Sequence, residues 1–288
     1  MYVIMGATGQ VGGATAKALL AEGNKVRVVV RNEEKAKVWR EYGAEPVFAD
    51  YGSAEALQAA FTGAEAVFVM NPAVFYPSEG FSETRETVAA VAKALVGANV
   101  PKFIALSSIG AHLPNGLGII ESLNILERGL ADLPIPSAFL RAAWFQDNSK
   151  WDIESARNDG KVVSFLQPLD RKIPMIATAD IGEIAAKTLQ QSWEGVRYLE
   201  LQGPEPYSPD DIASAFSKLL KREVNAVALP HNEWAEAFIA QGAPEDRIHG
   251  RIIAMLEGFN SGWIDFKYEG TELISGKITL EETLSQWV

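Results

Sequence analysis

The stretch MGATGQVGG, residues 5–13, holds four glycines in nine residues and stands almost at the start of the chain. Gly6, Gly9 and Gly12 form a GxxGxxG pattern between an apolar run, residues 2–5, and a helix-like segment. Glycines at these points let the backbone turn tightly and approach a ligand, while the first helical turn offers N–H groups to a pyrophosphate. The pattern predicts a dinucleotide-binding turn. The alternative is that the glycines only end a strand and cap a helix.

The segments that follow alternate between short apolar runs and helix-like stretches as far as residue 141. This alternation is typical of a parallel sheet with crossover helices, and near-continuous Val, Ile and Phe indicate strands buried on both faces. We therefore expect an α/β fold with a doubly wound parallel sheet, the Rossmann arrangement. The expected strands are residues 2–5, 25–30, 44–49, 64–70, 102–108 and 136–141, and the expected helices are residues 10–21, 33–42, 53–61, 81–96 and 119–131.

The regular alternation weakens beyond residue 150. We expect residues 1–150 to form the nucleotide-binding domain and residues 151–288 to form a smaller α+β portion that covers the substrate. Within the latter, residues 173–193 include a helix that we expect to return to the main sheet, with Asp180 as its cap. Eight large apolar residues would line a pocket or a dimer contact or, as the default, belong to ordinary core: Trp234, Phe238, Ile252, Ile253, Met255, Leu256, Phe259 and Trp263.

Composition excludes several classes of protein. With 48% hydrophobic and 22% charged residues, the chain is neither disordered nor fibrous, and no apolar run reaches the roughly 20 residues of a membrane helix. It has no cysteine and no signal-like N-terminal segment, so we expect a cytoplasmic protein. Asp and Glu outnumber Lys and Arg by 37 to 26, which argues against direct contact with nucleic acid. His112, His231 and His249 fit no metal motif, so we expect no metal.

The end of the second expected strand bears on the cofactor preference. NAD-binding sites usually carry an acidic residue there for the ribose hydroxyls, whereas this chain has Arg31. A guanidinium suits a 2′-phosphate because it can donate two charge-assisted hydrogen bonds to it. We therefore expect NADP(H) to be preferred over NAD(H). The alternative is that Arg31 is an exposed residue paired with Glu33 or Glu34.

An ordered set of motifs resembles the NmrA-like branch of the atypical short-chain dehydrogenase/reductases. The set consists of GATGQVGG, VRNEEKA, ADYGSAEALQAAFTGAEAVFVM, NVPKFIALSSIGA, FLRAAWFQDN and TADIGEIAAKTL. The resemblance covers nearly the whole chain and is strongest toward the NAD(P)H-dependent quinone oxidoreductase-like and triphenylmethane reductase-like members. It implies an NADPH-dependent reductase that transfers hydride to a quinone-like or other conjugated acceptor. The alternative it leaves open is a redox-sensing regulatory protein that binds NADP(H) without turnover.

The resemblance also implies a set of cofactor-binding residues along the sheet edge. Those for the phosphates would be Gly6, Thr8, Gly9, Gln10, Val11 and Gly12 at the pyrophosphate and Arg31 at the 2′-phosphate. Asp50 and Tyr51 would lie beside the adenine, and Met70, Asn71 and Pro72 would follow the cofactor along the edge. Ser107, Ser108 and Ile109 would approach the nicotinamide ribose, and Ala143, Trp144 and Phe145 would close over the nicotinamide. Outside the glycine turn, simple packing is an equal alternative for each.

One departure from the superfamily pattern limits the chemistry. No YxxxK pair occurs anywhere in the chain, and Leu123 stands where many NmrA-like members keep Lys or His. We expect Glu121 and Glu127, nearby, to be polar residues on a helix surface. Hydride transfer to a conjugated acceptor tolerates the loss, because it depends mainly on nicotinamide placement and solvent can protonate the product. The catalytic residue stays unassigned, with His112 as a weak candidate. We expect a small apolar or aromatic substrate, and leave open a homodimer or a regulatory protein partner.

Overall fold

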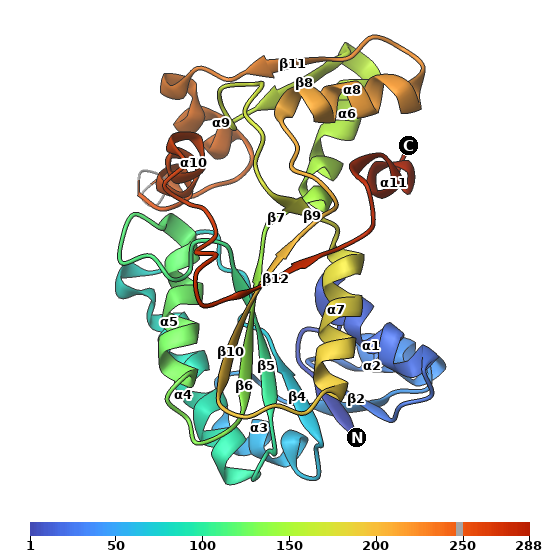
Figure 1. Ribbon diagram of the computed structural model, residues 1–288, viewed down its shortest axis with the longest axis vertical. Helices are drawn as coiled ribbons and strands as arrows, with labels where there is room; N and C mark the ends of the chain where they lie inside the picture. Colours follow the sequence, from blue (N-terminus) through green and yellow to red (C-terminus); the bar gives the residue numbers. More distant parts are fainter. Residues whose placement is uncertain (246–249) are drawn as a thin grey trace.

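The computed structural model describes residues 1–245 and 250–288, and a parallel sheet of eight strands forms its centre (Figure 1). The strand order is β12-β10-β6-β5-β4-β1-β2-β3, and every neighbouring pair runs parallel. In β1, Tyr2 lies between Val26 of β2 and Ala66 of β4. The chain reverses its direction across the sheet at this point, and doubly wound sheets bind ligands beyond the strand ends at such a reversal. The Rossmann fold is therefore confirmed.

The six strands expected from the sequence are all present, within two residues at each end. The strands of the main sheet are β1 (Tyr2–Ile4), β2 (Val26–Val30), β3 (Glu45–Phe48), β4 (Ala66–Val69), β5 (Phe103–Ser108), β6 (Ser137–Ala142), β10 (Val196–Gln202) and β12 (Glu272–Ser275). All four residues of β4 are buried, as a strand covered on both faces requires. The sequence did not predict that β10 and β12 join this sheet.

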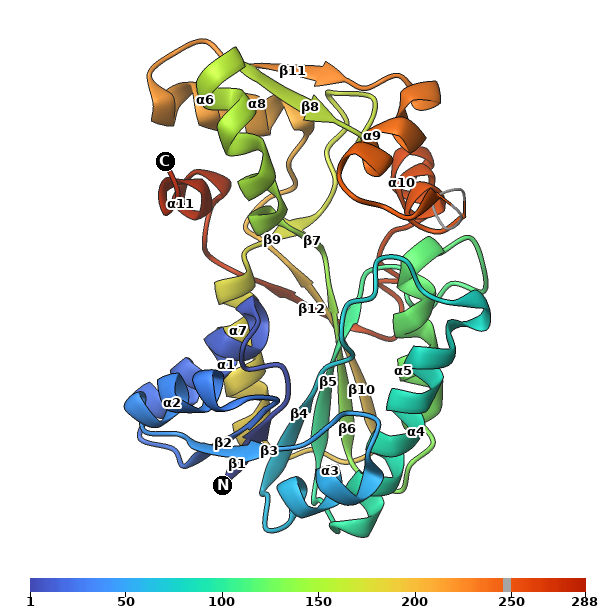
Figure 2. The ribbon, with the colours of Figure 1, turned by 180° about the vertical axis from the view of Figure 1, so that it is seen from behind.

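Helices cover both faces of the sheet, with α1, α2 and α7 on one face and α3, α4 and α5 on the other (Figure 2). Their bounds are α1 (Gln10–Ala21), α2 (Glu33–Glu41), α3 (Ala54–Phe61), α4 (Ser82–Gly97), α5 (Glu121–Leu130) and α7 (Thr178–Gln190). Asn32 and Ser53 cap α2 and α3 by accepting backbone N–H bonds from Lys35 and Ala56, which explains why these helices begin there. The five helices expected before residue 150 are thus confirmed.

The remaining elements form a second lobe beyond the strand ends, in the upper part of Figure 1. It contains β8 and β11, which pair in parallel, and five helices among the described residues. The bounds are α6 (Ile153–Asp159), β8 (Lys161–Ser164), α8 (Pro209–Leu220), β11 (Asn225–Ala228), α9 (Trp234–Ala240), α10 (Ile252–Ser261) and α11 (Leu280–Ser285). The short pair β7 (Trp144–Phe145) and β9 (Met175–Ile176) lies between the lobes. The 3₁₀ segments given for the described residues are η1 (Glu79–Phe81), η2 (Gly118–Ile120), η3 (Gln146–Asp152) and η4 (His231–Glu233). Where one domain ends and the next begins stays a prediction.

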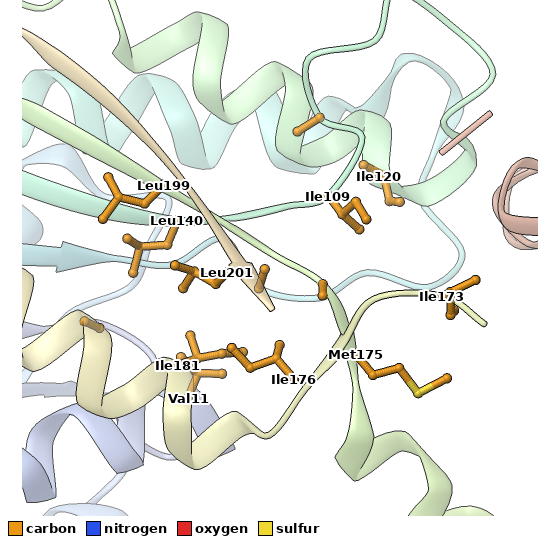
Figure 3. Packing of buried hydrophobic residues seen from close by; sticks show 14 of the residues in the cluster. Val11, Ile109, Ile120, Leu140, Ile173, Met175, Ile176, Ile181, Leu199 and Leu201 are labelled. Atoms are coloured by element: carbon orange, nitrogen blue, oxygen red, sulfur yellow. The ribbon is translucent and has the colours of Figure 1, made fainter. Parts of the chain in front are cut away.

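Helix α7 packs directly on α1, although the two are far apart in the sequence. The backbones approach so closely that a Cβ atom at Gly182 would lie 2.3 Å from the Cβ atom of Ala14. Val11 of α1 and Ile181 of α7 belong to one apolar cluster with Leu140 and Leu199 of the sheet (Figure 3). The helix that carries the glycine turn is therefore held in place by a segment from the second half of the chain.

The large apolar residues of the second lobe mostly belong to ordinary core, the default expected from the sequence. Trp234, Phe238, Leu256 and Phe259 are buried. Ile252, Ile253 and Met255 are half-buried against the same cluster, and Trp263 is 46% exposed. Most of this set is therefore occupied in holding the lobe together.

The prediction that Asp180 caps its helix is wrong. Asp180 lies inside α7, where its carboxylate accepts backbone N–H bonds from Lys277 and Ile278, both at 2.9 Å. The start of α7 is held instead by Asp147, which accepts bonds from the backbone N and the hydroxyl of Thr178 at 2.8 and 2.6 Å. The position of Asp180 near the start of the helix suggested a cap. In the structure, the backbone of residues 277–278 passes beside α7 and donates its N–H groups to the Asp180 carboxylate.

Candidate functional site

The glycine turn packs tightly against the protein at Gly6 and Gly12, and it faces solvent at residues 8–10. Gly6 has φ +66°, and a Cβ atom there would lie 2.2 Å from Cε of Met70. A Cβ atom at Gly12 would lie 2.4 Å from the carbonyl oxygen of Gly6. These two glycines are therefore required by the fold of the turn itself. Thr8, Gly9 and Gln10, at its apex, are exposed.

Gly9 leaves space for a ligand at the start of α1. It is the N-cap residue and has no side chain to bind the first N–H groups, while the nearest atom to a Cβ there would be the Gly6 oxygen at 3.4 Å. The first helical hydrogen bond is donated by Gly13 to Gly9 at 3.0 Å, so the N–H groups of residues 10–12 have no helical acceptor. Free N–H groups at the positive end of a helix fit the pyrophosphate that the sequence predicts.

Arg31 lies exposed just after β2, and the alternative of a local ion pair is not found. Glu33 pairs with Arg40, and Glu34 lies 3.9 Å from the amine of Lys35. Among the described residues, no ion pair includes Arg31. Arg27, near the start of β2, has a structural role. It donates to Glu45 at 2.8 Å and to the backbone carbonyls of Ala60 and Thr62. The guanidinium of Arg31 is thus free to bind an anion.

Tyr51 brings the end of the third strand to the glycine turn. Its hydroxyl accepts a hydrogen bond from the backbone N of Gly6 at 2.7 Å. Burial raises the pKa of Tyr51, although the Gly6 bond and the charge of Arg31 partly oppose this. Asp50, beside it, is exposed and accepts a 2.9 Å bond from Gly52 N. Residues predicted to hold the adenine end therefore gather around Gly6 and Arg31.

A buried polar side chain with an unused hydrogen-bond acceptor follows β4, the strand beside β1. Asn71 is 9% exposed, its amide nitrogen lies 3.5 Å from the hydroxyl of Thr84, and its Oδ1 has no hydrogen-bond partner among the described residues. Buried polar atoms normally have partners, so an unused acceptor at a ligand-binding edge fits a hydroxyl or amide of the cofactor. Met70 is half-buried over Gly6, and Pro72 is half-buried beyond Asn71.

The residues predicted near the nicotinamide lie at the ends of β5 and β6. Ser107 is buried and its hydroxyl donates to Glu127 at 2.6 Å, Ser108 is half-buried, and Ile109 donates its backbone N to Ala142 at 2.8 Å. Ala143 is buried, with its N bonded to Leu201, while Trp144 and Phe145 are half-buried. The ring of Trp144 meets Phe259 edge-on at 5.2 Å. The structure thus places these segments at one edge, and direct contact with a cofactor stays a prediction.

The prediction that Glu127 lies on a helix surface is wrong. Glu127 is 5% exposed, and its carboxylate accepts hydrogen bonds from Arg141 of β6 at 2.7 and 2.9 Å in addition to the one from Ser107. Arg141 is 4% exposed and also lies 4.0 Å from Glu200 of β10, which is fully buried. The pattern contained a signal for this pair: Arg141 interrupts an apolar strand, and Glu127 stands four residues after Leu123 on the helix face that meets the sheet.

The histidines take different positions. His112 is half-buried, its Nδ1 has no hydrogen-bond partner among the described residues, and its pKa is lowered, first by burial and then by the charge of Arg141. A catalytic role for His112 stays a prediction. His231 is exposed and lies 2.9 Å from Glu257, and His249 is outside the described residues. No three metal-ligating side chains gather anywhere in the described ranges.

Comparison with known proteins places the chain in a family. The model of the NmrA-like family matches residues 2–284. Quinone oxidoreductase 2 of Escherichia coli K12 is 26% identical over 247 residues, covering 85% of this chain and 83% of that one. An NAD(P)H azoreductase of Xenophilus azovorans is 24% identical over 246 residues, covering 85% and 82%.

Solved structures show the same fold over the whole chain. The crystal structure of an NADPH-dependent quinone oxidoreductase of Escherichia coli superimposes with a TM-score of 0.80 at 24% identity, covering 99% of both chains. The triphenylmethane reductase of a Citrobacter species gives 0.82 at 22% identity, covering 99% of this chain and 98% of that one. A family match over nearly every residue decides the assignment. The chain belongs to the NmrA-like family.

Proposed function

We propose that this protein is an NADPH-dependent reductase that transfers hydride to a quinone-like or other conjugated acceptor. The observation that carries the proposal is the open glycine turn with the unpaired guanidinium of Arg31 after the neighbouring strand. Its relatives support the chemistry, since they are a quinone oxidoreductase and an azoreductase, and a related quinone oxidoreductase was crystallised with NADPH. These relatives favour a reductase over a non-catalytic regulator.

Each part of the site has a task in this proposal. The N–H groups at the start of α1 bind the pyrophosphate, Arg31 binds the 2′-phosphate, and Oδ1 of Asn71 accepts a bond from the cofactor. When bound, NADPH supplies a hydride to the acceptor. Trp144 and Phe145, half-buried at the strand ends, form an apolar wall for a planar acceptor. A neutral acceptor such as a quinone or an azo compound becomes an anion when it receives hydride, and one proton from solvent completes its reduction. A cationic triphenylmethane dye becomes neutral on receiving hydride and needs no proton.

The test is NADPH oxidation by the purified protein across a panel of quinones, azo dyes and triphenylmethane dyes. We expect turnover with at least one conjugated acceptor and none with simple alcohols or their ketones, because the chain has no YxxxK pair. Tight NADPH binding without turnover on any acceptor would contradict the reductase and favour the regulatory alternative.

Arg31→Ala is expected to weaken NADPH binding by about tenfold to a hundredfold, because charge-assisted hydrogen bonds contribute roughly 1.5–3 kcal/mol. NADH binding is expected to stay within about twofold, since NADH has no 2′-phosphate. Titration calorimetry with both cofactors measures the two affinities. Arg40→Ala is the matched control, because Arg40 is also exposed and, among the described residues, its ion pair is with Glu33. Equal losses for the two cofactors would remove the role given to Arg31.

A cytoplasmic location and a homodimer or regulatory partner stay predictions. Within residues 1–245 and 250–288, no helix combines the length and the hydropathy that crossing a bilayer requires.

A further inference from the structure

Three segments that leave the sheet at its ligand-binding edge each contact helix α10 or its N-cap residue. After β4, the guanidinium carbon of Arg251, the N-cap of α10, lies 3.9 Å from the centre of the Phe81 ring. After β5, a Cβ atom at Gly118 would overlap the carbonyl oxygen of Arg251. After β6, the ring of Trp144 meets Phe259 of α10. Because β5 stands between β4 and β6, α10 spans the segments that follow all three strands, on the side of α4 and α5 (Figure 2).

The loop after β5 is packed firmly against α10 and the residues that follow it. Trp263 donates its indole N–H to the carbonyl of Asn115 at 2.9 Å. A Cβ atom at Gly110 would lie 2.9 Å from Cγ2 of Ile264, so the two backbones have no spare room between them. Phe259, which meets the segment after β6, is buried. We therefore expect the second lobe to stay fixed against the segments that follow β5 and β6.

The loop between β4 and α4 is held at both ends and free in its middle. Asn71, at its start, is buried, and Phe81, at its end, is buried with φ +57°, a conformation that a bulky residue keeps only where its surroundings hold it. Residues 73–75 are all exposed and make no hydrogen bond with any described residue. Two of their side chains are large and apolar, with Val74 37% and Phe75 57% exposed. The loop therefore presents an aromatic ring to solvent on a segment that few contacts hold in place.

This loop is continuous with the part of the site predicted to hold the cofactor. Met70, the residue after β4, covers Gly6 of the glycine turn, and Asn71 has the unused Oδ1. The strand order β6-β5-β4 sets the segments that carry Phe75 and Trp144 on opposite sides of β5, whose end is predicted to lie beside the nicotinamide ribose. An acceptor placed over the nicotinamide would therefore lie between these two segments and next to α10.

We propose that Phe75 is an acceptor-binding residue, an inference that rests on the reductase function proposed above. Residues 73–75 close over an acceptor that lies on the nicotinamide, and the ring of Phe75 packs on its planar face. Closure removes the exposed ring from water, which favours the closed loop, and these residues give up no hydrogen bond with the described chain when they move. Because aromatic rings pack best on other planar π systems, Phe75 selects planar conjugated acceptors over aliphatic ones.

The test is titration calorimetry of the full chain saturated with NADP⁺, which has no hydride to transfer, with 2-methyl-1,4-naphthoquinone as the probe. Phe75→Ala is expected to weaken binding of the quinone by about tenfold, because the aromatic contact and its buried area are lost. Phe75→Tyr keeps the ring and should stay within about twofold of the parent protein. Both variants should bind NADPH within about twofold of the parent. Phe48→Ala is the matched control, since Phe48 is 53% exposed on β3, the last strand at the far end of the sheet.

Hydrogen exchange measures the closure itself. The amides of residues 73–75 are expected to exchange more slowly when NADP⁺ and the quinone are both bound, and at the rate of the free protein with NADP⁺ alone. Full quinone affinity in Phe75→Ala, an equal loss in Phe48→Ala, unchanged exchange in the ternary complex, or no binding of the quinone to the parent protein would each overturn the inference.

Turnover with NADPH separates this inference from the reductase function. A parent protein that reduces the quinone, with the same KM in Phe75→Ala, would refute the role of Phe75 and leave the reductase function standing. A protein that binds the quinone through Phe75 but oxidises no NADPH with any acceptor would refute the reductase function instead.

Discussion

Gly9→Val is expected to abolish NADPH binding and turnover while leaving the fold intact. Gly9 has φ −94° and ψ 178°, a conformation that valine adopts readily, and its Cβ atom would meet only the Gly6 oxygen at 3.4 Å. The valine side chain would project into the space where the pyrophosphate approaches the start of α1. Losing two or more backbone bonds to a charged group, at about 1.5–3 kcal/mol each, weakens binding by more than about a hundredfold. Calorimetry with NADPH and thermal melting of the free protein measure the two parts of this prediction.

Gly12→Val provides the contrast within the same motif. Its Cβ atom would lie 2.4 Å from the Gly6 oxygen and 2.9 Å from the Met5 oxygen, so the backbone itself must move. We expect this variant to be strongly destabilised or unfolded, because overpacking against backbone cannot be relieved by a side-chain rotation. A Gly9→Val protein that melts like Gly12→Val, or one that binds NADPH normally, would contradict the assignment of Gly9 to the ligand.

Arg141→Met is expected to lower the free energy of unfolding by about 3–5 kcal/mol, because it leaves a buried carboxylate without its charge partner. Glu127 would keep only the hydroxyl of Ser107, and Glu200 would lose the nearby positive charge. For a chain of this size, such a loss lowers the melting temperature by roughly 10 °C. Chemical unfolding, followed by fluorescence, measures the change.

Arg197→Met is the matched control on the neighbouring strand. Arg197 also pairs with a glutamate through two bonds of 2.7 Å, but Arg197 and Glu272 are 20% and 49% exposed. Exposed pairs contribute about 0–1 kcal/mol because water solvates either charge when the partner is removed. The double variant Glu127→Leu with Arg141→Met should recover much of the stability, since it buries no unpaired charge. Similar losses in Arg141→Met and Arg197→Met would show that burial of the pair is unimportant.

The sequence by itself determined six strands of the main sheet, the five helices that alternate with them and the position of the glycine turn. The order of strands and helices up to residue 142 follows from local patterns, because apolar runs, capping residues and glycines act within a few residues of one another. The exposed apex of the turn and the free Arg31 agree with what GxxGxxG and the end of the second strand predict.

Only the tertiary structure decided the contacts between distant segments. Arg141 interrupts an apolar strand and Glu127 lies on the helix face toward the sheet, but only the packed chain shows that the two side chains meet, 14 residues apart. Asp180 stands 97 residues from Lys277, and no local pattern links these two residues. The places of β10 and β12 in the sheet are likewise set by the pairing of distant strands. Local preferences act through neighbouring residues, whereas a buried charge takes the partner that the packed chain brings to it. For that reason the sequence pointed to the turn, and the fold alone revealed the buried cluster of Arg141, Glu127 and Glu200.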